Sequence, residues 1–476
     1  MRVITSRHHL NCGGPRSPSM ALRSVAPFAA TALHISLAAC GGGNGGSTPA
    51  TYTIGGTVSG LATGTRLTLA NSGGNALTVT ANGAFTFTTP VAFNGSYAVT
   101  VGAQPTGQIC TVSGGSGTSV AANVTNVSVS CATTIGYAYT ANFDDSTLSQ
   151  YAIVTGGSLV PLAPPTVVSA GLSYPTSIVV DPTDRYAYVT NAGLGPGGIG
   201  VATVSEYAIE ADGVLVPLST PIVASALNPR SIAIDPTGRF AYVVNEGEIP
   251  IGGTGGNSIS QYAIGASGEL APMAPATVTT GHLPGSIAID PTGHYAYVTN
   301  NSDNTISQYT IGTDGALTPM STPTVTTGTH PFSVIADPTG PYVYCVNFNG
   351  DSVSQYAIGA GSALAPLGTP TVATGHIPDS MAVDPSGQYI YVTNAGDLTV
   401  SQYSIMAGGA LAPLNPATVT TGNSSSIRID ATGHYVFLAT GNTVSQYMIG
   451  AGGALVPLSP LTVATGLTPV AIATTH

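Results

Sequence analysis

Arg230 and Glu246 are the two residues of this sequence that best suit chemistry. Arg230 opens one predicted strand and Glu246 follows its hairpin partner, so both should reach the same edge of one sheet. An arginine can hold a carboxylate or a developing oxyanion, and a glutamate can activate water as a general base. The pair therefore suggests hydrolysis, although a surface ion pair of little energetic weight would produce the same pattern.

Further ionisable residues are expected on the same face of the predicted fold as this pair. Three histidines precede apolar runs in successive repeats: His282, His330 and His376. Eight acids fall on the same side of the predicted fold: Asp144, Asp145, Glu246, Glu248, Asp303, Asp351, Asp379 and Asp397. A metal site would need a tight ligand spacing that these residues lack. We therefore expect the three histidines and Glu248 to line a binding face, with no metal and no other cofactor.

A repeated unit positions these residues, and its clearest copy is SIAIDPTGHYAYVTN, residues 286–300. Residues 287–289 suit a short buried strand, and the following DPTG fits a type I turn. Residues 295–299 alternate as a second strand. A third strand is expected at residues 305–311 and a fourth from residue 317 to 325. Four antiparallel strands per unit are typical of a β-propeller blade.

The repeats number seven. The second-strand motif occurs at Tyr137–Asn142, Tyr186–Asn191, Phe240–Asn245, Tyr295–Asn300, Tyr342–Asn347, Tyr389–Asn394 and Tyr435–Thr440. The first-strand motif is shifted, beginning at Ser177, Ser231, Ser286, Ser333, Ser380 and Ser426, with a last copy at Val470–Ala473. The last strand should therefore join the first three, close the ring and remove the free edges. We predict an all-β chain with a seven-bladed β-propeller over residues 132–476.

This topology sorts the loops between two faces. First strands begin and second strands end at one face, where propeller ligands usually bind. The turn acids lie on the opposite face and are explained by turn geometry: Asp181, Asp184, Asp235, Asp290, Asp337, Asp384 and Asp430. Two enlarged loops, 191–207 and 245–262, lie on the first face in adjacent blades. Such insertions often mark a binding face, although neutral drift of the loops would look the same.

The motif SIAIDPTGRFAYVVN and its copies resemble the seven-bladed lactonase family, also described by its YVTN repeat, which includes 6-phosphogluconolactonase-like proteins. The resemblance covers nearly all of residues 132–476 and implies that Arg230 and Glu246 are active-site residues. The family usually places a histidine where this sequence has Ser231, and an arginine where it has Asn301. A further family histidine is replaced within residues 174–177, so about half of the implied site is absent.

The first part of the sequence resembles a bacterial lipoprotein leader. Arg23 precedes an apolar segment of signal-peptide length, and LAAC, residues 37–40, resembles a lipobox. We expect residues 1–39 to be the leader, with Met20 a possible true start, and Cys40 to carry a lipid. Residues 40–50 would form a glycine-rich tether. By resemblance, Gly41 favours the outer membrane of a Gram-negative bacterium; an ordinary signal peptide with a chance cysteine is the alternative.

Residues 51–131 form a separate predicted domain. Short alternating runs separated by Gly and Asn turns indicate a small β-sandwich. Cys110 and Cys131 are the only cysteines in this stretch, and an exported protein would oxidise them to a disulfide. The stretch carries no recognisable chemistry and is interpreted as a spacer or adhesion module.

Composition narrows the possible functions. The 476 residues contain 43% apolar but only 6% charged residues, with a net charge of −11. This acidic balance argues against binding nucleic acid or an anionic membrane surface, because both require basic patches.

We therefore expect an extracytoplasmic, lipid-anchored propeller that binds an unknown small molecule or protein as an interaction module. A lactone hydrolase using Arg230 and Glu246 is the alternative. A divalent-cation-dependent adhesin is a third possibility. A phosphorylated sugar lactone would suit the site poorly, since no basic cluster accompanies Arg230.

Overall fold

The computed structural model describes residues 49–168, 171, 173–193, 201–247, 257–359 and 361–476. The leader, Cys40 and Glu248 lie outside these ranges. The described residues form β-strands and no α-helix, and accordingly none of them forms a helix able to cross a membrane.

The N-terminal module contains two small sheets around one core. The strands of the first sheet that belong to this module are β2 (Ile54–Ser59), β5 (Gly83–Thr86), β8 (Gln108–Ser113) and the beginning of β10 (Val124–Asn142). The second sheet contains β3 (Leu67–Asn71), β4 (Asn75–Val79), β7 (Tyr97–Ala103) and β9 (Ser116–Gly117), and a short separate pair joins β1 (Thr51–Tyr52) to β6 (Val91–Ala92). Ile54 of the first sheet and Leu69 of the second are fully buried in the shared core, as expected for a β-sandwich.

The predicted disulfide is confirmed. Cys110 of β8 pairs with Cys131 of β10 across the sheet, and their sulfur atoms are 2.01 Å apart. β10 then continues beyond Cys131 into the first blade of the propeller, so the module and the propeller share one uninterrupted strand.

Six propeller blades follow in sequence order, each with four antiparallel strands. They are β13 (Pro175–Val180), β14 (Tyr186–Asn191), β15 (Thr203–Ile209) and β16 (Leu215–Ala224); β17 (Pro229–Ile234), β18 (Phe240–Asn245), β19 (Ser258–Ile264) and β20 (Leu270–Thr279); β21 (Pro284–Ile289), β22 (Tyr295–Asn300), β23 (Thr305–Ile311) and β24 (Leu317–Thr326). The remaining three are β25 (Pro331–Ala336), β26 (Tyr342–Asn347), β27 (Ser352–Ile358) and β28 (Leu364–Ala373); β29 (Pro378–Val383), β30 (Tyr389–Asn394), β31 (Thr399–Ile405) and β32 (Leu411–Thr420); β33 (Ser424–Ile429), β34 (Tyr435–Thr440), β35 (Thr443–Ile449) and β36 (Leu455–Ala464).

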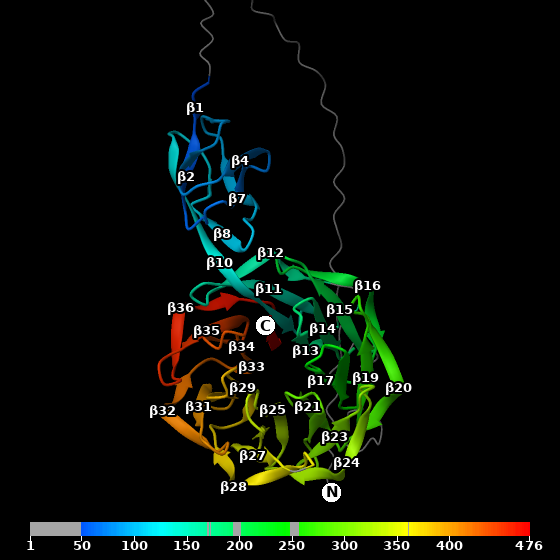
Figure 1. Cartoon of the computed structure of the whole chain (residues 1–476). Coiled ribbons are helices and arrows are strands. Elements are labelled where there is room, and N and C mark those ends of the chain that lie inside the picture. The colour runs from blue at the N-terminus through cyan, green and yellow to red at the C-terminus, as the bar shows by residue number, and fades with distance from the viewer. Residues whose placement is uncertain (1–48, 169–170, 172, 194–200, 248–256, 360) are drawn as a thin grey trace, which may run out of the picture. The chain divides into compact units, whose positions relative to one another are not determined.

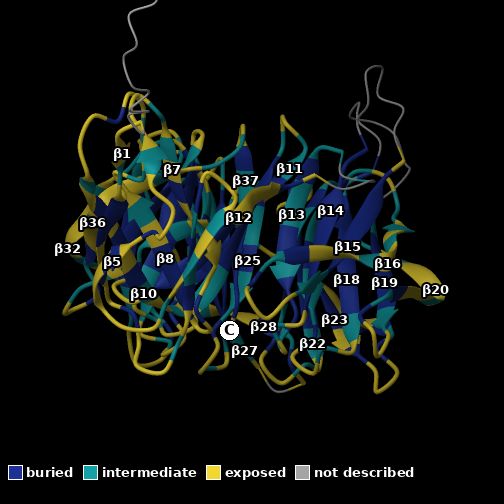
Figure 2. Ribbon diagram, turned by 90° about the horizontal axis from the view of Figure 1, so that it is seen from above, coloured by how far each residue is buried: buried dark blue, intermediate teal, exposed yellow. Residues whose placement is uncertain are grey.

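The seventh blade closes the ring as predicted. β37 (Pro469–Thr474) pairs antiparallel with the end of β10, where Tyr139 faces Ala473. β11 (Thr147–Val154) and β12 (Leu159–Val167) complete this blade. Figure 1 shows the resulting ring of blades. Burial follows the position of each strand in its blade: β14 is buried throughout, whereas β20 is largely exposed (Figure 2).

The turn acids have the structural role that the sequence indicates. In the unit that begins at Ser286, Asp290 accepts hydrogen bonds through Oδ1 from the backbone N–H groups of His294 (2.9 Å) and Tyr295 (2.8 Å). Its Oδ2 accepts the N–H of Thr292 at 3.1 Å. The carboxylate therefore organises the hairpin turn.

Neighbouring blades are joined by buried tyrosines of the second strands. The hydroxyl of Tyr139 donates to the carbonyl of Gly213 in the next blade at 2.7 Å. Five further tyrosines make the equivalent bond: Tyr188, Tyr242, Tyr297, Tyr344 and Tyr391. In β34 the equivalent residue is the buried Phe437, which has no hydroxyl group. The equivalent carbonyl belongs to Gly157, because the ring of Tyr435 packs against Gly157 as the ring of Tyr137 packs against Gly213.

Replacing Phe437 with Tyr should stabilise the protein by about 1 kcal/mol, because the new hydroxyl would supply the missing bond between blades. Urea unfolding at 25 °C would measure the change. The matched control is Tyr391→Phe, which should destabilise by a similar amount. Unchanged or reduced stability of the Phe437→Tyr variant, beside the expected loss in the control, would contradict the prediction.

Third strands provide a second link between blades. Six glutamines each accept the N–H of a leucine in the next blade and donate to a carbonyl in their own blade: Gln150, Gln261, Gln308, Gln355, Gln402 and Gln446. Glu206 replaces this glutamine in β15 and accepts the N–H of Leu270 at 3.2 Å. Its Oε2 is buried without a hydrogen-bond partner among the described residues, which makes Glu206 a weak point of the fold.

Candidate active site

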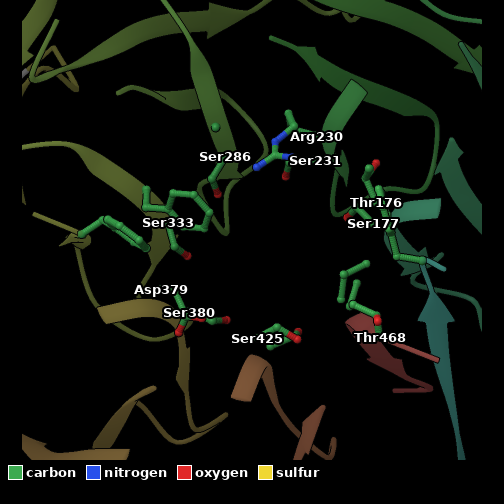
Figure 3. A pocket seen from close by; sticks show the side chains of 17 residues that line it. Thr176, Ser177, Arg230, Ser231, Ser286, Ser333, Asp379, Ser380, Ser425 and Thr468 are labelled. Carbon is green, nitrogen blue, oxygen red and sulfur yellow. The ribbon is translucent and has the colours of Figure 1, made fainter. Parts of the chain in front are cut away.

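A cavity of about 530 Å³ lies where the inner strands of the blades begin. Two rings of side chains line it (Figure 3). The first ring contains the second residue of each inner strand: Thr176, Arg230, Gly285, Phe332, Asp379, Ser425 and Val470. The second ring contains the next residue: Ser177, Ser231, Ser286, Ser333, Ser380, Ser426 and Ala471. The repeated serines thus form a hydroxyl-lined ring, while the first ring has a different residue type in each blade.

A β-bulge places the residues of the first ring. In β17, Pro229 pairs with Asn245 and Ser231 pairs with Val244, so Arg230 is an extra residue without a partner in the ladder. The same shift in register occurs at the start of every inner strand. Bulges redirect a side chain and are common beside active sites. The fold therefore presents one variable residue per blade to the cavity.

The structure brings Arg230 and Glu246 together. Nε of Arg230 lies 3.5 Å from Oε2 of Glu246, and the two side chains are 37% and 14% exposed. The same Oε2 accepts a hydrogen bond from Nδ2 of Asn228 at 2.7 Å, and the N–H of Glu246 donates to the carbonyl of Asn228 at 3.0 Å. Arg230 lines the cavity, whereas Glu246 lies beside it and is not among the lining residues. This short loop contact holds the carboxylate against the guanidinium.

The three candidate histidines lie outside the lining of the cavity. Nδ1 of His282 is 2.9 Å from Asp303 and Nδ1 of His376 is 3.0 Å from Asp351, both at exposed positions. The hydrogen bond that Nδ1–H of His376 donates to Asp351 raises the pKa of His376 and lowers that of Asp351.

His330 has a different environment. Its ring packs on Phe348 with centroids 5.7 Å apart, and burial lowers its pKa while the nearby charge of Glu246 opposes this shift. No group of three possible metal ligands occurs among the described residues. The predicted binding-face residue Glu248 lies outside them.

Asp379 was not selected from the sequence as a site residue, yet it lines the cavity. Thr393 Oγ1 donates to its Oδ1 at 2.5 Å, and burial raises the pKa of the carboxyl to about 7 despite this bond. Phe332 and the serine ring were missed as well. Aligning the repeats on the proline that opens six of the seven inner strands would have found all of them, since each follows that position by one or two residues.

The sequence model of the family described as "Lactonase, 7-bladed beta-propeller" matches residues 77–365. The chain belongs to this lactonase family. Among solved structures, a protein from Bacteroides uniformis ATCC 8492 provisionally named 6-phosphogluconolactonase is 17% identical with a TM-score of 0.60, covering 71% of this chain and 99% of its own. The periplasmic gluconolactonase PpgL from Pseudomonas aeruginosa is 19% identical with a TM-score of 0.60, covering 72% and 99%.

At 17% and 19% sequence identity, these structural similarities show a shared fold alone. No curated protein sequence matches the chain significantly.

This lactonase-family propeller departs from the implied family site in a consistent way. Ser231 lines the cavity at a position where the resemblance implies a histidine. Thr176 and Ser177 line it within the stretch 174–177, where the resemblance implies another. Asn301 stands where the resemblance implies an arginine. Its side chain is buried, and its Oδ1 has no hydrogen-bond partner among the described residues. A Cβ atom added to Gly285 would lie only 2.9 Å from this Oδ1, so the two residues are in close contact. Of the described residues that line this cavity, Arg230 is the only cation.

Proposed function

We propose that the chain hydrolyses a lactone in this cavity, with Arg230 and Glu246 as active-site residues. The observation that carries the proposal is the bulged Arg230 side chain, which lines the cavity while paired with Glu246 at 3.5 Å. Membership of the lactonase family supports hydrolysis over the interaction module that the sequence analysis placed first.

The two side chains suit the two charge changes of the reaction. Water attacks the lactone carbonyl and the carbonyl oxygen becomes negative, so the guanidinium of Arg230, which lines the cavity, stabilises this oxygen. The carboxylate of Glu246 accepts the proton that the attacking water loses. Asn228 holds Glu246 in place through its bond to Oε2.

An uncharged, hydroxyl-rich lactone suits the lining best. Ring serines offer hydroxyl groups, and Phe143, Phe332 and Phe348 offer apolar surface, a combination that matches a sugar ring with polar edges and apolar faces. A phosphate group would require further cations beside Arg230, and the described residues that line this cavity include none. Names of the structural relatives, which include a gluconolactonase, support a sugar lactone as the substrate class.

We also propose that the enzyme works outside the cytoplasm, tethered to the outer membrane through a lipid on Cys40. The LAAC motif at residues 37–40 supports this proposal. Mass spectrometry of the mature N-terminus would detect the acyl chains, and an unmodified or absent Cys40 would refute it.

The test is hydrolysis of glucono-δ-lactone and of its 6-phospho derivative by the purified protein. The base needed to hold the solution at neutral pH measures the acid that hydrolysis releases. We expect turnover of the unphosphorylated lactone, and a loss of about 100-fold or more in the isosteric Glu246→Gln variant. Asp303→Asn, which changes an exposed acid bonded to His282, is the matched control and should keep full activity. Equal rates in both variants would exclude Glu246 as the base. A wild-type protein that binds these lactones without turnover would instead support the binding-module alternative.

A further inference from the structure

The carboxyl group of Asp379 lines the cavity on the far side from Arg230. Asp379 occupies in β29 the same bulge position that Arg230 occupies in β17. These strands belong to blades three steps apart in a ring of seven, so the two side chains approach the cavity from nearly opposite sides. Figure 3 shows them on different sides of the opening. A ligand in the cavity therefore lies between a cation and a carboxyl group.

The surroundings of Asp379 favour its neutral form. Thr393 is the one side chain of the described residues that bonds to this carboxyl, and the backbone amides of Asp379 and Ser380 lie against it. Burial outweighs these three hydrogen bonds and raises the pKa of Asp379 to about 7. Near neutral pH this group therefore holds a proton in a large fraction of the molecules.

No cation of a neighbouring strand forms an ion pair with Asp379 among the described residues. The titratable residues on the strands packed against β29 are Tyr342, Tyr344 and Cys345 in β26, Tyr389 and Tyr391 in β30, and Arg428 in β33, while β25 has none. Arg428 is the only basic side chain among these, and burial lowers its pKa. His376, nearby in sequence, is bonded to Asp351 instead.

We propose that Asp379 is the general acid that protonates the departing ring oxygen of the lactone, an inference that rests on the proposed hydrolytic function. Water forms the new C–O bond at the carbonyl carbon and gives its proton to Glu246. The ester C–O bond of the ring then breaks, and its electron pair and the proton of Asp379 produce the hydroxyl of the open-chain product. Glu246 returns its proton and Asp379 regains one through solvent, so the net change is the addition of one water.

Two carboxyl groups in different environments thus divide the acid and base roles. Glu246 is paired with a guanidinium, whereas Asp379 is half-buried and bonded to the hydroxyl of Thr393. The alkoxide that leaves a sugar lactone is a strong base and needs this proton, whereas the phenoxide that leaves an aryl lactone does not. The proposal therefore predicts a dependence on the leaving group that a merely structural Asp379 would not produce.

The experiment compares glucono-δ-lactone with dihydrocoumarin, an aryl lactone, in the wild type, Asp379→Asn and Glu246→Gln. Asp379→Asn should lower kcat/KM on the sugar lactone about 100-fold and on dihydrocoumarin less than about 5-fold, in the range of general acid catalysis. Glu246→Gln should lower both. The wild type should also lose kcat/KM on the sugar lactone as the pH rises through about 7, because the acid ionises, and Asp379→Asn should lack this limb.

Asp397→Asn, in the same blade but at an exposed position, is the matched control and should behave as the wild type. Equal losses on both substrates in Asp379→Asn, or an unchanged pH limb, would overturn the general-acid proposal while Glu246→Gln still reports hydrolysis. Wild-type protein that opens neither lactone would overturn the proposed function itself, and the general acid with it.

Discussion

Replacing Arg230 with Met should lower kcat/KM for the lactone by about 100- to 1000-fold, equivalent to roughly 3–4 kcal/mol of transition-state stabilisation. Met fills similar space but cannot donate hydrogen bonds to the oxyanion. Arg230→Lys keeps the charge without the planar fork of donors, and should recover only part of the loss. Steady-state kinetics on glucono-δ-lactone would measure all three proteins.

Arg239→Met is the control for this prediction. Arg239 belongs to the same blade but lies at the opposite end of the hairpin, where it donates to the carbonyl of Thr313 at 3.0 Å. Its replacement should leave kcat/KM unchanged. If Arg230→Met kept more than about a third of the wild-type value, Arg230 could not be the oxyanion donor, and hydrolysis would have to rely on other groups.

Replacing Glu206 with Gln should stabilise the protein by about 2 kcal/mol at pH 8, a large effect for one buried group. Glu206 is 1% exposed, and burial raises the pKa of its carboxyl to about 7. Its unpaired Oε2 takes the place of an amide nitrogen that donates to a carbonyl fourteen residues later in the other blades. By equivalence that carbonyl belongs to Thr220, and a glutamine would donate to it.

The stability gained by Glu206→Gln should depend on pH. A carboxyl whose pKa is raised in the folded state binds its proton more tightly there, so wild-type stability is lost as pH rises from about 4.5 to about 7. The advantage of Glu206→Gln should therefore grow across this window and level off above it. Urea unfolding at pH 4.5 and pH 8 would measure the difference.

The reverse exchange provides the matched control. Gln261 makes both bonds in the next blade, so Gln261→Glu should destabilise the protein at pH 8 and much less at pH 4.5. An equal effect of Glu206→Gln at both pH values would contradict the explanation by ionisation.

The repeats explain why the fold could be predicted from the sequence. Each hairpin is local: a strand, a DPTG turn and a second strand lie within some fifteen residues, so propensity and turn chemistry define it without reference to distant contacts. The offset between first- and second-strand motifs also predicted that β37 would close the ring with β10. The disulfide followed from the isolation of two cysteines in one module.

The site could be predicted only in part. Arg230 and Glu246 flank a single hairpin, so their proximity follows from local pairing and appeared in the sequence. The histidines share the predicted face, but the sequence could not show that they would lie outside the lining of the cavity. Asp379 appeared as one acid among eight, because its distinguishing features are a bulge and the partial loss of water around its carboxyl group.

The sequence by itself therefore determined the all-β propeller, its seven blades, its closure and the Arg230–Glu246 pair. Only the tertiary structure decided which residues meet in the cavity, because closing the ring brings together inner strands that lie some fifty residues apart in the chain. It also decided the ionisation of Asp379 and Glu206, since the pKa of a carboxyl depends on the water removed from it when blades pack together, and that loss of hydration is not a local property of the sequence.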